Sequence, residues 1–224
     1  MSYALVTSRK WNEYLVEKLE EKTQQKWYLI TKREEFTLDY LQKISPVKIF
    51  IPHWSYIIPK DIWEEYECVV FHMTDLPFGR GGSPLQNLIV RKIRETKISA
   101  IKVSKEIDEG DIYLKSSLGL EGAAHEIFKR FSIEVEKMIL KIINENIHPV
   151  PQEGEITLFE RRKPEQGNLF KLKQLEDVYD YIRMLDAPGY PKAFVENKSF
   201  KIEFENANFE NSKSLTANVR IIKK

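Results

Sequence analysis

The stretch CVVFHMTDLPFGRGGSPLQNLIV, residues 68–90, combines an apolar strand, a glycine-rich loop and the start of a helix. His72 directly follows the apolar residues 68–71, so we expect its imidazole at the end of a buried strand. The glycines of the loop permit a close approach of the backbone to a ligand. Ser83 and Pro84 are typical of an N-cap and a first helical residue. In open α/β sheets, a loop at the carboxyl end of a parallel strand is where ligands bind.

Outward from this stretch, apolar runs alternate with segments of helical periodicity. Strands are expected at 3–6, 26–30, 47–51, 68–71 and 98–103. Helices are expected at 8–21, 36–44, 59–66, from 84 onward and at 121–144. This alternation predicts an α/β fold, with a Rossmann-like, mostly parallel sheet flanked by helices. No Gly-x-Gly-x-x-Gly follows the first strand, so a dinucleotide site is not expected.

A second part of the chain is expected after residue 150. Two prolines and a glycine lie within residues 149–154, which is typical of a boundary. Beyond it we expect a strand at 156–159, a helix at 172–185 and strands at 193–209 and 215–222. The sequence therefore predicts a catalytic domain at 1–150 and a small, mainly β C-terminal subdomain at 151–224.

Composition limits the classes of function. The 224 residues are 42% hydrophobic and 31% charged, with a formal net charge of +1, which fits a globular protein without a strong preference for polyanions. The single cysteine, Cys68, allows no intramolecular disulfide, and we expect no metal site. No charged leader and no apolar run of membrane-spanning length is visible, so we expect a cytoplasmic protein that binds neither membrane nor nucleic acid.

A second motif, IDEGD at residues 107–111, places Asp108 in a tight acidic turn between two strands. A charged β-turn is the simplest interpretation, and a calcium loop would need a different ligand spacing. An imidazole and a carboxylate delivered from neighbouring strand ends can act as a proton-transfer pair. We therefore take His72 and Asp108 as the candidate catalytic residues.

The order of these motifs, His-x-x-x-Leu-Pro, then Gly-Ser-Pro-Leu-Gln, then Asp-x-Gly-Asp, resembles the formyltransferase family that uses 10-formyltetrahydrofolate. The resemblance covers residues 47–194. It implies that an amine attacks the formyl carbon of 10-formyltetrahydrofolate, which is released as tetrahydrofolate. His72 would stabilise the oxyanion and shuttle a proton, and Asp108 would orient His72 or relay that proton.

One position departs from the family pattern. The family usually places an asparagine two residues before the histidine, and Val70 stands there in this chain. Loss of an oxyanion donor typically lowers the rate by about 10²–10³. Asn87, on the helix that follows the loop, is our candidate replacement, and a solvated helix position is the alternative.

The resemblance also implies a folate pocket. The segment HWSYIIP, residues 53–59, looks like the part of the family that frames the pterin ring, and the backbone of residues 104–107 would complete it. The cofactor-binding residues expected on this basis are Ser55, Tyr56, Ile57, Ser104, Lys105, Glu106 and Ile107. An aromatic run such as this can equally belong to the core.

The segments FERRKPE, residues 159–165, and LDAPGYPKAF, residues 185–194, resemble the members that act on sugar nucleotides. Adjacent arginines can hold a diphosphate, although a solvated basic turn is the alternative. The substrate-binding residues expected on this basis are Phe78, Gly79, Arg80, Gly81, Gly82, Arg161 and Arg162.

The resemblance implies transfer of a formyl group to the amino group of a nucleotide-linked deoxyamino sugar, a UDP-4-amino-4,6-dideoxy-N-acetylhexosamine of bacterial polysaccharide or flagellin glycan biosynthesis. The expected partner is thus a small nucleotide sugar, with a homodimer as a further candidate. Two alternatives remain. One is formylation of an aminoacyl group on tRNA or on a carrier protein. The other is a catalytically silent relative that binds folate or a sugar nucleotide.

Overall fold

The computed structural model describes residues 1–211 and 213–224. The chain forms two compact units. The first comprises residues 1–81, 96–118 and 129–158, and the second comprises residues 82–95, 119–128 and 159–224. These units interleave along the chain, whereas the boundary expected near residue 150 divides the sequence into two consecutive segments. In both descriptions residues 159–224 stay together.

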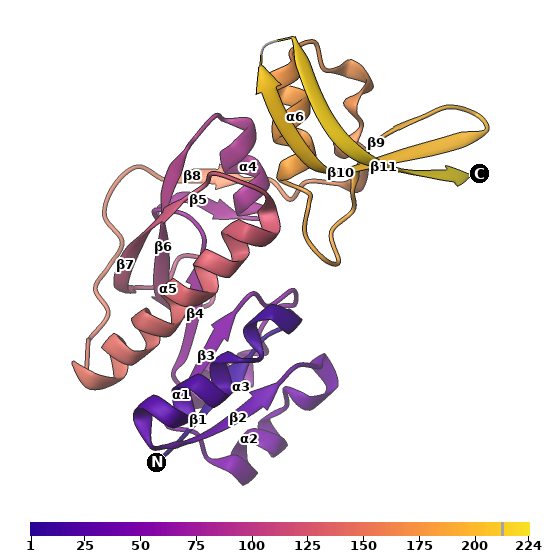
Figure 1. Ribbon diagram of the computed structural model, residues 1–224. Helices are drawn as coiled ribbons and strands as arrows, with labels where there is room; N and C mark the ends of the chain where they lie inside the picture. Colours follow the sequence, from indigo (N-terminus) through magenta and orange to yellow (C-terminus); the bar gives the residue numbers. More distant parts are fainter. Residues whose placement is uncertain (212) are drawn as a thin grey trace. The chain divides into compact units, whose positions relative to one another are not determined.

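The first unit is built on a six-stranded sheet with the order β2-β1-β3-β4-β6-β7 (Figure 1). Its strands are β1 (Ser2–Val6), β2 (Lys26–Ile30), β3 (Lys48–Pro52), β4 (Cys68–His72), β6 (Glu95–Lys102) and β7 (Ile112–Gly119). The strands β1 to β4 pair in parallel, and β6 runs antiparallel to β4. The α/β fold with a mostly parallel sheet is therefore confirmed.

Six α-helices accompany the strands in the described residues. They are α1 (Leu15–Thr23), α2 (Leu38–Ile44), α3 (Lys60–Glu65), α4 (Pro84–Val90), α5 (Ala124–Asn144) and α6 (Leu175–Arg183). The helix expected at 8–21 was placed too early, because α1 begins only at Leu15. A 3₁₀ turn at Lys10–Asn12 precedes it, and the buried Asn12 amide there donates to Thr7 Oγ1 at 3.1 Å. None of the helices in the described part of the chain is long and apolar enough to cross a membrane.

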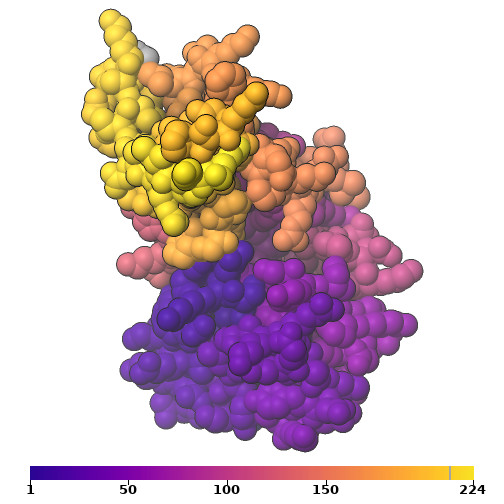
Figure 2. Space-filling model, turned by 90° about the vertical axis from the view of Figure 1, so that its right-hand side faces the viewer, coloured from indigo at the N-terminus to yellow at the C-terminus, as the bar shows by residue number. Residues whose placement is uncertain are grey.

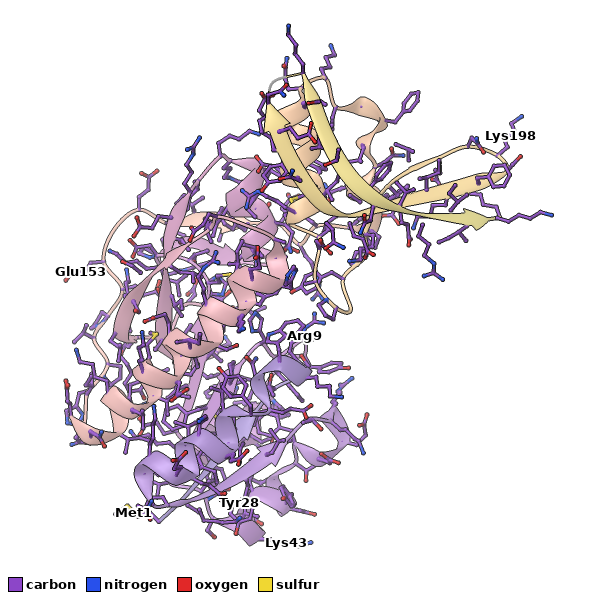
Figure 3. All side chains as sticks on the ribbon, in the orientation of Figure 1. Met1, Arg9, Tyr28, Lys43, Glu153 and Lys198 are labelled. Carbon is purple, nitrogen blue, oxygen red and sulfur yellow. The ribbon has the colours of Figure 1, made fainter. Side chains whose placement is uncertain are left out.

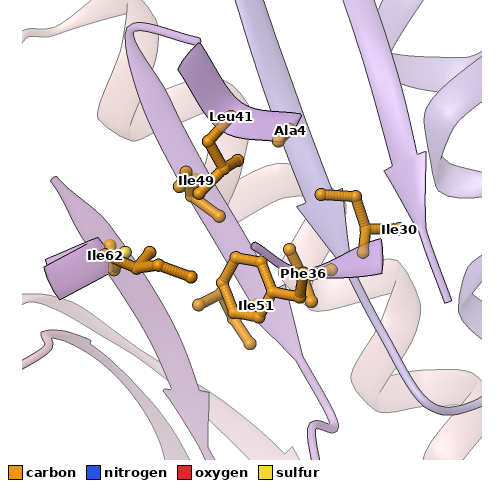
Figure 4. Packing of buried hydrophobic residues seen from close by; sticks show 9 residues of the cluster. Ala4, Ile30, Phe36, Leu41, Ile49, Ile51 and Ile62 are labelled. Carbon is orange, nitrogen blue, oxygen red and sulfur yellow. The ribbon is translucent and has the colours of Figure 1, made fainter. Parts of the chain in front are cut away.

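One face of the parallel sheet packs against α2 and α3 through branched aliphatic side chains (Figure 4). Ile49 and Ile51 of β3 lie in this cluster with Leu41 of α2 and Ile62 of α3, all fully buried. Burial of one such side chain contributes about 1.5–3 kcal/mol. The cluster takes alternate residues of each strand, such as Ala4 and Val6 of β1, so a register shift of one residue would turn these side chains to the other face.

Aromatic rings fill the opposite face. Trp27 of β2 lies 4.9 Å from Tyr3 of β1 and 5.6 Å from Phe50 of β3, measured between ring centroids. Trp27 also donates through Nε1 to Thr23 at the end of α1, at 3.0 Å. The face is therefore tied to α1 by a hydrogen bond as well as by apolar contact, which satisfies the buried indole.

The second unit contains a three-stranded antiparallel sheet with the order β9-β10-β11. Its strands are β9 (Ala193–Glu196), β10 (Phe200–Asn211) and β11 (Ser214–Lys223), and α6 packs against β10 and β11. Side chains of the β10–β11 hairpin reach the surface (Figure 2). Lys198 lies at the turn between β9 and β10 (Figure 3). The small antiparallel C-terminal sheet is confirmed.

The glycine loop contains one element that the sequence did not predict. Phe78–Gly81 forms the strand β5, which pairs with β8 (Thr157–Phe159). Ser83 occupies the N-cap position and Pro84 begins α4, as expected, but the φ of Ser83 is left-handed at 51° and its side chain makes no capping hydrogen bond. Instead, its Oγ accepts from the Arg162 backbone N–H at 3.0 Å.

Candidate active site

His72 and Asp108 lie together, as the sequence predicted. His72 is the last residue of β4 and is only 7% exposed. Its Nδ1 lies 3.4 Å from Oδ1 of Asp108. Its Nε2 lies 2.8 Å from the carbonyl oxygen of Gly79, which can only accept, so Nε2 carries a proton. With Nε2 protonated, a hydrogen bond between Nδ1 and Oδ1 requires one further proton on either group.

The backbone of the acidic turn is unusual at Asp108. Its φ is 57°, in the left-handed region that aspartate tolerates better than most residues. Oδ2 of Asp108 accepts from the Gly81 backbone N–H at 2.9 Å. Gly81 itself has a φ of 107°, a conformation that favours glycine. A glycine is also required at 110, where a Cβ would lie 1.6 Å from the carbonyl oxygen of Lys102.

Arg80 lies beneath this turn rather than in solvent. It is 8% exposed, and its Nη1 donates to Glu109 at 2.7 Å. Its Nε and Nη2 donate to Oε1 of Gln152 at 3.2 and 2.9 Å. All three nitrogens of the guanidinium are therefore engaged within the first unit, and binding of a substrate by Arg80 would compete with these bonds.

A hydroxyl and an amine hold the loop that follows His72. Ser99 of β6, which is fully buried, donates through Oγ to the Thr74 carbonyl at 2.7 Å and accepts from the Leu76 N–H at 3.2 Å. Lys115 of β7 donates to Asp75 at 2.5 Å. Burial alone raises the pKa of Asp75, but the hydrogen bonds from Lys115 and Lys97 outweigh burial and lower it.

Val70 offers no donor in place of the family asparagine. It pairs with Ile101 of β6 and packs against Leu76 and Ile112. Position 70 therefore lies in an apolar cluster, and a donor to an oxyanion would have to come from another residue.

The candidate replacement, Asn87, belongs to the second unit. Its Nδ2 donates to the carbonyl oxygens of Gly82 and Glu160 at 2.9 and 2.8 Å. Its Oδ1 accepts from Arg91 at 3.3 Å. Both amide hydrogens are engaged, so donation to an oxyanion would require one of these bonds to break.

The segment expected to frame the pterin ring begins at His53, which is partly buried. Burial, and then the charge of Arg9, lower the pKa of His53 to about 3, so the ring is neutral at physiological pH. Beyond it the chain turns outward, since Tyr56 is 48% and Ile57 75% exposed. Ser55 remains tied to the loop after β1 by a hydroxyl contact of 3.0 Å to Ser8.

The second expected folate segment, residues 104–107, is also a surface turn. Ser104 donates to the Glu106 carbonyl at 3.3 Å, Lys105 pairs with Glu106 at 3.6 Å, and Ile107 is 63% exposed. Val103, which precedes it, and Trp54 pack against the same buried cluster. Each of these two surface turns exposes one apolar side chain, Ile57 and Ile107. Exposed apolar side chains of this kind suit contact with a flat aromatic ligand.

The remaining expected substrate residues differ in their surroundings. Phe78 lies half-buried in β5. In the second unit, Gly82 donates its N–H to the Phe159 carbonyl at 3.0 Å, and a Cβ at 82 would lie 2.6 Å from Cβ of Arg161. Arg161 is exposed, and the Arg162 guanidinium lies 5.4 Å from the centroid of the Tyr181 ring.

Comparison with known proteins decides the family. A solved structure of methionyl-tRNA formyltransferase from Clostridium thermocellum is 48% identical, with a TM-score of 0.95 and coverage of 100% of both chains. The chain belongs to the 10-formyltetrahydrofolate-dependent formyltransferase family. A family model described as the methionyl-tRNA formyltransferase C-terminal domain matches residues 164–222 of the chain.

More distant relatives of the chain fall into two groups. Methionyl-tRNA formyltransferase of Rickettsia felis is 29% identical over 156 residues, which are 66% of this chain and 50% of that protein. The chain thus spans about half the length of the curated relatives it matches. A sugar N-formyltransferase from Shewanella sp. shares the fold, with a TM-score of 0.72, 14% identity and coverage of 92% and 97% of the two chains.

These comparisons correct one expectation. The sequence motifs suggested the sugar-nucleotide members as the nearest branch, whereas the full-length relative at 48% identity is a methionyl-tRNA formyltransferase. The formyltransferase family itself is confirmed. The motifs around His72 and Asp108 resemble the family as a whole and did not distinguish between its branches.

No sequence signal singled out Gln152, Glu109 or Ser99 as parts of the site. Gln152 follows two prolines in what looked like a boundary segment, and Glu109 was one acid among three. A pattern in the sequence could have drawn attention only to the turn itself, since Gln152 reaches it across 44 residues of chain.

Proposed function

We propose that the protein transfers the formyl group of 10-formyltetrahydrofolate to the α-amino group of an aminoacyl-tRNA, with methionyl-tRNA as the first candidate. The observation that carries the transfer is the contact of 3.4 Å between His72 Nδ1 and Asp108 Oδ1 at the end of β4. The choice of acceptor is supported by the relative that is 48% identical along its whole length.

The residues suit the proton movements of this reaction. The neutral acceptor amine attacks the formyl carbon, a C–N bond forms, and the bond from that carbon to N10 of the folate breaks. One proton leaves the amine and one proton reaches N10, so a group that accepts and returns a proton is needed. The His72–Asp108 pair can take that proton and give it back.

His72 also has a second task. Its ring, when protonated on both nitrogens, places a positive charge beside the developing oxyanion, and direct donation from Nε2 would replace the bond to the Gly79 carbonyl. Since Val70 supplies no donor, we expect the enzyme to depend on this imidazolium more than a member with asparagine at that position. The folate would lie along Tyr56, Ile57 and Ile107, with the backbone of residues 104–107 beside the pterin ring.

A second candidate acceptor is a nucleotide-linked amino sugar. One arrangement in the second unit favours it, because Arg161 and Arg162 are adjacent and the Arg162 guanidinium lies against Tyr181. Two guanidinium groups suit a diphosphate, and an aromatic ring suits a base.

One assay separates these candidates. Purified protein is incubated with 10-formyltetrahydrofolate and either methionyl-tRNA or a panel of UDP- and dTDP-linked amino sugars, and release of tetrahydrofolate and the mass of the acceptor are followed. We expect a formyl group on methionine that is lost in His72→Ala. Formylation of a sugar alone would overturn the tRNA proposal, and absence of transfer to every acceptor would overturn formyl transfer to these two classes.

A further inference from the structure

The reacting carboxylate lies on a turn that a side chain distant in sequence must hold in place. Asp108 has a left-handed φ of 57°, which a non-glycine residue keeps only when its surroundings over-determine it. Among the described contacts, no side chain of residues 107–111 bonds to the Asp108 carbonyl oxygen. The group that reaches this carbonyl is Gln152.

The side-chain amide of Gln152 bonds both the acidic turn and Arg80. Its Nε2 donates to the carbonyl oxygens of Asp108 and Gly110, at 2.8 Å each. Its Oε1 accepts from two nitrogens of Arg80, at 3.2 and 2.9 Å. All four hydrogen-bonding positions of the primary amide are therefore filled.

Arg80 also bonds the acidic turn. It donates to Glu109, the residue between the two carbonyls that Gln152 holds. The next residue, Gly81, donates its N–H to the Asp108 carboxylate. The backbone and the side chain of Asp108 are thus fixed by two groups that are linked through Arg80.

We propose that Gln152 is a positioning residue of the formyltransferase reaction, which sets the backbone of the acidic turn and thereby the orientation of Asp108 toward His72. Gln152 lies on the segment between α5 and β8, beside Glu153, which Figure 3 shows pointing away from the chain. The inference rests on the proposed function for its kinetic readout and on the geometry alone for its structural readout.

Gln152→Glu gives the sharpest test because it preserves size. The carboxylate can still accept from Arg80, but an oxygen replaces the nitrogen that donates to Asp108 and Gly110. Small displacements of a reacting group lower rates by about 100-fold, so we expect kcat to fall about 10- to 100-fold. The KM for folate and for the acceptor should change less than about threefold, because Gln152 contacts neither in this proposal.

The pH profile separates positioning from a general loss of structure. In the Gln152→Glu variant, protonation of the introduced carboxylate restores one donor, and an ordinary glutamate has a pKa of about 4.3. About 6% of such a carboxyl is protonated at pH 5.5. With a fully active protonated form, the ratio of kcat for Gln152→Glu to kcat for wild type should therefore rise from about 0.01 at pH 8 to about 0.07 at pH 5.5 for a loss of about 100-fold, and by about half for a loss of about 10-fold. Gln152→Met, which has no donor at any pH, should show the same loss without this rise.

The control is Gln42→Glu, the same chemical change at an exposed residue of α2, whose amide donates to Glu65 at 3.5 Å. It should retain wild-type kcat. A Gln152→Glu enzyme with kcat within twofold of wild type, or one whose KM rises in step with the loss of kcat, would overturn the proposal.

A second measurement does not depend on turnover. The ¹⁵N shifts of the His72 ring, assigned by comparison with His72→Ala, should change in Gln152→Glu and in Gln152→Met but not in Gln42→Glu. Unchanged His72 shifts in folded Gln152 variants would refute the positioning role. If wild type transferred no formyl group to any acceptor, the proposed function would fail while these shifts still tested the inference.

Discussion

The two sheets of this protein differ in how deeply they are buried. In β1, β3 and β4 of the six-stranded sheet, at least four of five residues are buried, whereas every residue of β10 and β11 that the structure describes is at least partly exposed. The parallel sheet is covered on two faces by apolar side chains, as parallel sheets generally are. The antiparallel hairpin leaves Val219 and Ile221 56% and 65% exposed. His72 ends β4 of the buried sheet, so the proposed catalytic residue belongs to the more tightly packed of the two sheets.

The largest expected effect concerns the residue at the end of the buried sheet. His72→Asn should lower kcat by about 10²–10⁴, because a general acid–base group and a charged donor are both lost. The acceptor KM should change much less. We would measure formyl transfer under saturating folate, with circular dichroism as the control for folding. Retention of more than a tenth of wild-type kcat would contradict the role of His72.

The free energy of unfolding should distinguish the buried sheet from the exposed one. Phe50→Ala, in the middle of β3, removes a fully buried ring that contacts Trp27, and it should destabilise the protein by about 3–5 kcal/mol. The matched change Val219→Ala on β11 should cost less than about 1 kcal/mol. Urea unfolding monitored by tryptophan fluorescence gives both values. Similar losses from both changes would mean that the hairpin is covered in solution.

The pH dependence of stability tests the loop after β3. The pKa of His53 is lowered to about 3 in the folded protein by burial and by Arg9, whereas an unfolded histidine titrates near 6.5. A lowered folded pKa contributes stability above pH 6.5 that is lost as the pH falls toward 3, by up to about 1.4 kcal/mol per pH unit. Between pH 7 and pH 5, above the range of most carboxylates, the free energy of unfolding should fall.

The control for this slope is His53→Asn. Asparagine tolerates the φ of 55° at this position and does not titrate. Its free energy of unfolding should be lower at pH 7 and nearly independent of pH between 7 and 5. A slope equal to that of wild type would show that another group is responsible.

A smaller effect is expected for Ser99, whose hydroxyl bonds the loop that follows His72. Ser99→Ala leaves the Leu76 N–H and the Thr74 carbonyl without their side-chain partner, and such a loss costs about 1–3 kcal/mol. The matched change Ser214→Ala removes an exposed hydroxyl from β11 and should stay within about 0.5 kcal/mol. Equal melting temperatures for the two variants would contradict a structural role of Ser99.

Sequence patterns predicted the buried parts of the molecule well and the irregular parts poorly. The strands of the parallel sheet were found because continuous apolar runs such as Lys48–Pro52 leave little choice of structure. The start of α4 at Pro84 was predicted correctly, but the role of the Ser83 hydroxyl was not, because this hydroxyl accepts from the distant Arg162 N–H instead of capping the helix. The strand β5 was missed because glycines carry no apolar pattern.

The sequence by itself determined the α/β architecture, the family, and the pairing of His72 with Asp108, since each depends on residues that are close in the chain or on motifs in a fixed order. Only the tertiary structure decided how that pair is held. Gln152 and Arg80 reach the acidic turn across 44 and 29 residues, respectively. The physical reason is that a hydrogen bond across such a separation depends on the packing of whole elements, and no local periodicity or turn preference records it.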